Sequence, residues 1–141
     1  MCELFAMSSR LPADIAFSLE AFSRHGGLEG PHKDGWGIAH FVDHDVQLVK
    51  EPLPASDSAC VRFIHDNPFT ATLVVSHIRK ATRGAVALKN CQPFTRELGG
   101  RMHVFAHNGH LDHTGLARHR AGGSFRPSVN TSRQSWCHSK N

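Results

Sequence analysis

The feature that most constrains this chain is a cysteine at its second position, followed directly by a short segment of alternating apolar residues. The alternation over residues 2–7 predicts a first β-strand. A cysteine at the start of a strand can be a small buried residue. Since methionine is normally removed ahead of a small residue, Cys2 can also become the first residue of the mature protein. It would then carry a thiol and a free α-amine together.

The length and composition predict one soluble domain. A chain of 141 residues is long enough for one compact domain and too short for two. No apolar run reaches the length of a membrane helix, and the first residues lack the basic and apolar regions of a signal peptide. We therefore expect a cytoplasmic protein that does not contact a membrane.

The formal net charge of +4 comes from the C-terminal part of the chain. Five Lys or Arg residues and no acidic residues follow Asp112. Residues 116–141 are predicted to form an irregular basic tail, because their apolar residues show no periodicity. Such a tail can bind nucleic acid. We do not expect this here, because aromatic residues that could stack on bases do not alternate with the basic ones.

The pattern of apolar residues predicts short strands mixed with two helices, which is typical of the α+β class. Apolar residues at helical spacing from Leu11 to Phe22, with Pro12 in the first turn, predict the first helix. Residues 56–67 contain an N-cap candidate and predict the second. Strands are expected at 2–7, at 36–42 and 46–50 as a hairpin, at 72–79 and at 103–107. Residues 90–94 are expected to be irregular.

Four short stretches contain residues that could act in catalysis or substrate binding. They are Cys2, HKDGWG (32–37), SHIRKATRG (76–84) with NCQPF (90–94), and FAHNGHL (105–111). Each stretch alone has an ordinary structural explanation, such as a packed indole or a common turn sequence. In this order and combination they resemble the class II glutamine amidotransferases, a branch of the N-terminal-nucleophile hydrolases. The resemblance runs from Met1 to about Gly115, and it is strongest to the stand-alone bacterial type that opens with MCEL.

The resemblance implies the four-layer α-β-β-α sandwich of N-terminal-nucleophile hydrolases, with the nucleophile at the start of a central strand. Residues 1–141 are expected to contain only the amino-terminal portion of this glutamine amidotransferase type-2 domain. The resemblance implies no metal and no cofactor. It implies glutamine as the substrate.

The chemistry follows from a cysteine at a free N-terminus. Its α-amine has a reference pKa of about 7.7–8.0 and its thiol one of about 8.5, and a base works best when its pKa lies near the operating pH. N-terminal threonine enzymes use the same arrangement. The Cys2 thiolate would attack the side-chain amide carbon of glutamine, release ammonia and leave a thioester that water hydrolyses.

The resemblance also implies roles for residues around this nucleophile. The Asn108 side-chain amide and the Gly109 backbone N–H would stabilise the oxyanion of the tetrahedral intermediate. Arg79 would bind the α-carboxylate of the substrate through its planar guanidinium, and Thr82 in the same RxAT motif would shape that pocket. His77 is expected to be structural, on the same strand face as Arg79.

Two further segments are expected to support the pocket. The first contains the substrate-binding candidates Asp34, Gly35 and Trp36. The second contains Asn90, Gln92 and Pro93. Their expected role is to lie close to the substrate and hold the residues that contact it.

The chain departs from the family pattern near its end. After the FRP motif (125–127), Thr131 stands where the family carries an aspartate that holds the α-amino group of the substrate. The chain also ends where such domains usually continue. A truncated or degenerate gene product, a fragment of a longer protein, and a protein with a different substrate or none all fit. We favour truncation or degeneration over a working short enzyme.

Other functions fit parts of the sequence. His103, His107, His110 and His113 recur at helical spacing and could bind a metal, although residues 103–107 are predicted to be a strand, which would separate them. A binding module without turnover and a γ-glutamyl amide hydrolase are two more alternatives. No motif of an ammonia-accepting enzyme is present, so transfer of ammonia would need a partner protein.

Overall fold

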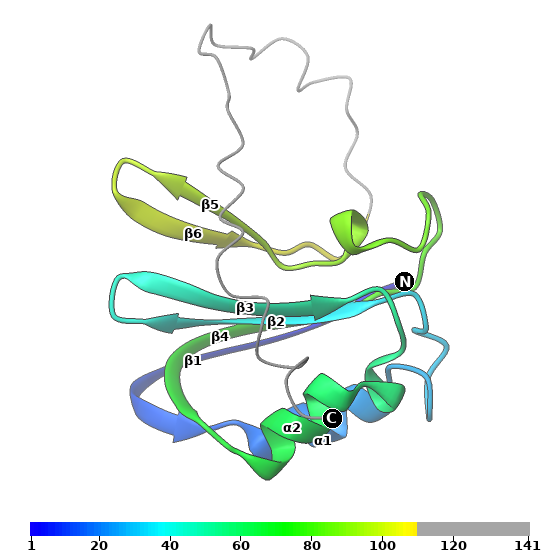
Figure 1. Ribbon diagram of the computed structural model, residues 1–141, viewed down its shortest axis with the longest axis horizontal. Helices are drawn as coiled ribbons and strands as arrows, with labels where there is room; N and C mark the ends of the chain where they lie inside the picture. The colour runs from blue at the N-terminus through cyan, green and yellow to red at the C-terminus, as the bar shows by residue number, and fades with distance from the viewer. Residues whose placement is uncertain (110–141) are drawn as a thin grey trace, which may run out of the picture.

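The computed structural model describes residues 1–109 of the chain. These residues form three layers, as Figure 1 shows: two helices, a four-stranded sheet and a two-stranded sheet. The elements, in chain order, are β1 (Glu3–Asp14), α1 (Ala16–Arg24), β2 (Trp36–Val42), β3 (Asp45–Glu51), η1 (Ala55–Asp57), α2 (Ala59–Asp66), β4 (Thr70–Ile78), η2 (Leu88–Asn90), β5 (Phe94–Leu98) and β6 (Arg101–Phe105). In this part of the chain, no helix has the length and apolar character needed to cross a membrane.

The larger sheet is antiparallel and has the strand order β1-β4-β2-β3. Strand β4 lies between β1 and β2, so its residues pair on both sides. Ile78 pairs with Glu3 on β1 and with Trp36 on β2. This register brings the beginning of β1 beside the end of β4, although the two are far apart in the sequence.

The hydrophobic core lies between the helices and one face of this sheet. Side chains alternate across a strand, so every second residue of β2 and β4 faces the helices. Trp36, Ile38, Val74 and Ile78 are each at most 1% exposed. They pack with apolar residues of α1 and α2, including Leu19. Each such side chain stabilises the fold by about 1.5–3 kcal/mol through its burial.

The hairpin of β5 and β6 lies on the other side of the sheet, and β6 contacts β3 (Figure 1). A glycine allows this close approach. A Cβ atom at Gly37 would overlap the backbone oxygen of Gln92, which lies two residues before the hairpin. The side chain missing from residue 37 therefore lets the second layer pack directly onto β2.

The predicted first helix was wrong at its beginning. Leu11 and Pro12 belong to β1, and Leu11 is 73% exposed. Pairing of β1 with β4 resumes at Ala13 after an irregular stretch, which is where a proline without an N–H can be accommodated. The helix starts instead after Asp14, whose carboxylate accepts a hydrogen bond of 2.7 Å from the N–H of Ala16.

The remaining elements largely follow the expectations. The hairpin of β2 and β3, the strand β4 and the helix α2 are confirmed, and Ser58 caps α2 by accepting a hydrogen bond from the N–H of Val61. Strand β5 was missed, because residues 90–94 were expected to be irregular and no strand was predicted between them and residue 103. The α+β class is confirmed, and the described layers correspond to the first three of the expected α-β-β-α order.

Candidate active site

Cys2 lies at the beginning of β1, beside the residues that follow β4. Its thiol donates a hydrogen bond of 3.5 Å to the backbone oxygen of Lys80. Cys2 is half-buried and its thiol is free. A cavity of about 370 Å³ opens at this point. Its lining residues are Cys2, Arg79, Lys80, Ala81, Thr82, Arg83, His107 and Gly109.

The guanidinium of Arg79 organises the loop that forms one wall of this cavity. Its two terminal nitrogens donate to the backbone oxygens of Arg83, Gly84 and Ala85 over 3.0–3.3 Å, and also to that of Asp34. Arg79 is only 6% exposed. The side chain therefore combines a buried positive charge at the cavity with a structural role in folding the chain around itself, which the sequence did not indicate.

The segment before β2 fixes the same loop from the other side. The Asp34 carboxylate accepts a hydrogen bond of 2.7 Å from the N–H of Ala81, and the backbone groups of Asp34 and Gly35 bond to those of Arg79. Gly35 has a φ of +125°. A Cβ atom there would lie 2.5 Å from the sulfur of Cys91. Only glycine satisfies both the backbone conformation and the tight packing at this position.

Gln92 holds the segment that carries the predicted oxyanion donors. Its buried side-chain oxygen accepts a hydrogen bond of 2.7 Å from the N–H of His107. This contact fixes the chain where it leaves β6 and turns at Asn108 and Gly109. Gly109 has a φ of +138°, which is accessible mainly to glycine. The turn therefore reaches the cavity through a glycine whose position is set by a side chain from another segment.

His77 is buried on the face of β4 that points away from the helices. It is 0% exposed, and neither ring nitrogen has a hydrogen-bond partner among residues 1–109. Its pKa is lowered to about 4, mainly by burial and in addition by the electrostatic effects of His107 and Arg79. The His107 backbone favours the protonated form weakly, without reaching hydrogen-bond geometry. His77 is thus neutral at physiological pH.

Comparisons with known proteins show which family this chain belongs to. A profile of the class II glutamine amidotransferases matches residues 1–139. The chain is a member of the class II glutamine amidotransferases. It is 46% identical over 127 residues to YafJ of Escherichia coli (strain K12), whose name assigns it provisionally to glutamine amidotransferases. It is 32% identical over 111 residues to the uncharacterised protein MJ1515 of Methanocaldococcus jannaschii.

A solved structure of a similar protein supports the fold. The crystal structure of a predicted glutamine amidotransferase from Pseudomonas aeruginosa PA01 shares 37% identity with this chain at a TM-score of 0.50. The match covers 79% of this chain and 44% of that one. The alignment with YafJ likewise covers 90% of this chain and 49% of YafJ. The chain therefore spans about half the length of these two relatives, and a smaller share (30%) of MJ1515.

Several of the amidotransferase residues predicted from the sequence come together in the structure. Cys2, Arg79, Thr82 and Gly109 all line the cavity. Asn108 is exposed beside it but is not among the lining residues. Asp34 and Gly35 lie behind the wall of the cavity and hold it. The predicted aspartate position, Thr131, and the basic tail (116–141) fall outside the described residues.

Trp36 does not line this cavity. Its indole lies in the core on the helix side of the sheet, where its N–H donates a hydrogen bond of 3.1 Å to the carboxylate of Glu51. Residues 36 and 37 lie on opposite faces of β2, and the face that points toward the β5–β6 hairpin belongs to Gly37. Trp36 supports the site only through the packing of β2.

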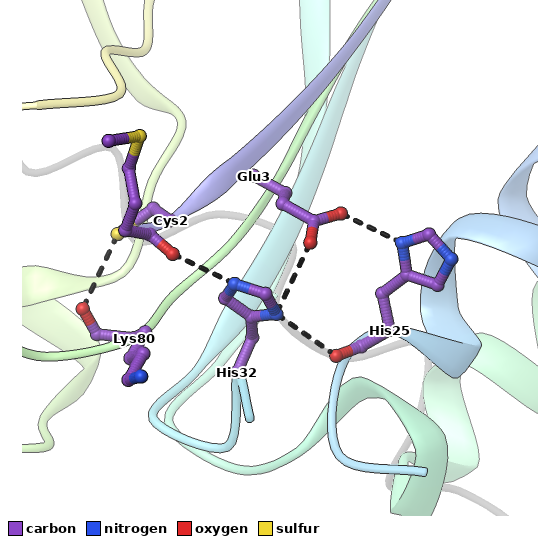
Figure 2. A network of polar contacts seen from close by, with 6 residues as sticks. Cys2, Glu3, His25, His32 and Lys80 are labelled. Atoms are coloured by element: carbon purple, nitrogen blue, oxygen red, sulfur yellow. Dashed lines mark hydrogen bonds and ion pairs between the residues drawn. The ribbon is translucent and has the colours of Figure 1, made fainter. Parts of the chain in front are cut away.

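The sequence did not single out His32, the first residue of the HKDGWG stretch. Figure 2 shows its imidazole between Glu3, His25 and the start of β1. His32 is 6% exposed. One ring nitrogen, Nε2, lies 2.8 Å from the backbone oxygen of Met1. His32 is identified as a candidate site residue because it is buried close to Cys2. The sequence alone, a histidine followed by a lysine, does not reveal that burial.

The positively charged residues that line the cavity suit the binding of a negatively charged group. Arg79, Lys80 and Arg83 are among its lining residues, and none of the lining residues in the described part of the chain is acidic. Within residues 1–109, no group of three or more His, Cys, Asp or Glu side chains is arranged to hold a metal ion. Of the predicted set, His103 lies on β6 and His107 follows that strand, whereas His110 and His113 fall outside the described residues.

Proposed function

We propose that this protein hydrolyses the side-chain amide of glutamine, with Cys2 as the nucleophile. The observation that carries the proposal is one cavity lined by Cys2, Arg79 and Gly109 together. Removal of Met1 would free the α-amine of Cys2. That amine takes the thiol proton, the thiolate attacks the amide carbon, and the amine returns the proton to the departing ammonia.

Donors near the cavity support stabilisation of the oxyanion. The N–H of Gly109 and the side chain of Asn108 are the proposed donors for the tetrahedral intermediate. The thioester left after ammonia departs is then hydrolysed by water, which restores the thiol. The fixed backbone of His107, held by Gln92, supports this assignment because oxyanion donors act best when they are positioned in advance.

The positive wall of the cavity supports binding of the substrate's α-carboxylate. Arg79 is the proposed binding residue, and Thr82 lies beside it. The Arg79 guanidinium already donates hydrogen bonds to backbone oxygens of the 83–85 segment. A substrate carboxylate that accepts from the same nitrogens would therefore replace some of these hydrogen bonds. We expect this loop to adjust when the substrate binds.

We propose a cytoplasmic enzyme whose ammonia is released or passed to a partner protein. The test uses the full chain. Intact-mass measurement reports whether Met1 is removed, and a glutamine-analogue electrophile is then expected to modify Cys2 alone. Ammonia release from glutamine, asparagine and γ-glutamyl amides identifies the substrate. Retention of Met1, or glutamine binding without any ammonia release, would contradict the proposal.

A further inference from the structure

The buried imidazole of His32 is surrounded by oxygen atoms that accept hydrogen bonds. Its Nε2 faces the Met1 backbone oxygen at 2.8 Å, and its Nδ1 faces the His25 backbone oxygen at 3.2 Å. The Glu3 carboxylate lies 3.5 Å from the same Nδ1. These contacts are visible in Figure 2. A neutral imidazole has one N–H and one acceptor nitrogen, so a neutral His32 can donate to only one of these two groups of oxygens.

The surroundings of His32 are built for this contact. A Cβ atom at Gly30 would clash with the His25 backbone oxygen and lie within 3.0 Å of the His32 Nδ1. Glycine at this position leaves room for the imidazole. The second carboxylate oxygen of Glu3 is held at 2.8 Å by the ring of His25. Glu3 is thus fixed between two histidines, at the first position of β1 and next to Cys2.

Removal of Met1 changes what His32 faces. The oxygen and nitrogen of one amide group are about 2.3 Å apart. The nitrogen of Cys2 therefore lies within about 5 Å of His32 Nε2, a span that a small ring movement or one water molecule can bridge. Once the carbonyl of Met1 is gone, Nε2 can accept a proton from the Cys2 α-ammonium. Its Nδ1–H continues to donate to His25 and Glu3.

We propose that His32 is a positioning residue that takes the proton of the Cys2 α-ammonium and leaves the α-amine free as the base. This inference rests on the proposed N-terminal nucleophile. An N–H bond of the ammonium breaks and an Nε2–H bond forms, so His32 becomes an imidazolium beside the Glu3 carboxylate. The free amine then accepts the proton of the thiol, whose S–H bond breaks to give the thiolate.

The charges around His32 support this direction of transfer. Glu3 on β1 stabilises the imidazolium, and the ring of His25 at the end of α1 shares that carboxylate. His77 on β4 also acts electrostatically on this region, but its low pKa of about 4 keeps it neutral at the working pH. The backbone oxygen of Lys80 orients the thiol.

The experiment measures the rate at which iodoacetamide alkylates Cys2 between pH 5 and pH 10, read from the N-terminal peptide by mass spectrometry. Because the Cys2 terminus and His32 exchange a proton, the dependence of the alkylation rate on pH reports the two groups together rather than either one alone. We expect H32Q to move the alkaline rise to higher pH by about one unit, and to slow alkylation at pH 7 about tenfold. E3Q is expected to cause a smaller shift in the same direction.

The matched control is H44Q, because His44 is exposed at the turn between β2 and β3. It should leave the profile unchanged. Equal slowing of H32Q at every pH, or an unmoved profile in E3Q, would overturn the inference. E3Q tests it independently if H32Q does not fold, since Glu3 is 38% exposed at its side chain. Iodoacetamide needs only a thiol, so the result does not depend on glutamine turnover.

Discussion

The two faces of the four-stranded sheet differ in chemistry although the same strands form both. On β4, Ile78 packs against the helices, whereas the adjacent His77 lies on the opposite face with the cavity residues. On β2, Ile38 belongs to the core and Gly37 to the contact with the β5–β6 side. One residue therefore separates a position that determines stability from one that serves the site. Substitutions on the two faces should have separable effects.

The largest effect is expected from C2A, at the site end of β1. Loss of the proposed nucleophile should reduce ammonia release by at least about 10⁴-fold. The free energy of unfolding should stay the same, because Cys2 is only half-buried and outside the core. Steady-state ammonia assays and urea unfolding measure the two quantities. S8A, an exposed position on the same strand, serves as the control with normal activity.

The second effect concerns the turn after β6. N108A should lower kcat by about 10²–10³-fold while KM changes little, because the proposed contact strengthens only when the oxyanion forms. The exposed Asn108 should leave stability unchanged. A loss confined to KM would instead place Asn108 in ground-state binding and remove it from the oxyanion role.

The third substitution lies on the opposite face of the sheet. I38A removes a side chain that is 1% exposed, and it should lower the free energy of unfolding by about 2–5 kcal/mol. V42A, on the same strand but 43% exposed, should cost far less. Under conditions where both are folded, alkylation of Cys2 should proceed at the normal rate. A slowed rate in folded I38A would show that the two faces are coupled.

The smallest effect appears only as a pH dependence. The unfolded His77 binds a proton below about pH 6.5, whereas the folded one does so only near pH 4. The unfolded state therefore holds more protons in this interval, and the free energy of unfolding falls as the pH drops from 6.5 toward 4. The loss amounts to at most about 3 kcal/mol.

H77M removes the titrating group and keeps an apolar side chain in its place. Its stability should decline less than that of the native protein between pH 6.5 and pH 4.5, as measured by urea unfolding at each pH. Identical declines would mean that His77 becomes protonated easily inside the folded protein. Exposed histidines contribute equally to both proteins, so the difference between them isolates His77.

Residue spacing correctly predicted the elements in which pairing with distant segments agrees with the local pattern. Strand β4, the hairpin of β2 and β3, and α2 with its Ser58 cap were all readable from residue spacing. The start of α1 was not, because Leu11 continues the apolar spacing of the helix although pairing with β4 keeps the chain extended as far as Asp14. Long-range pairing outweighed local spacing there.

The missed strand β5 had a usable signal. Gly99 and Gly100, both with positive φ, join it to β6, and two glycines between short segments are typical of a hairpin turn. The site was predicted from the order of its motifs rather than from any local pattern. What the sequence could not supply was burial: the placement of Trp36 in the core and of His32 beside the terminus depends on the packing of distant segments.

The pairing of Glu3 with Ile78 also has a consequence for synthesis. A ribosome adds about 5–20 residues per second, so the first strand waits several seconds before its neighbour in the sheet emerges. During this time the amino end is an unfolded tail that a processing enzyme can reach. The removal of Met1 that the proposed mechanism requires would thus come before β1 and β4 pair.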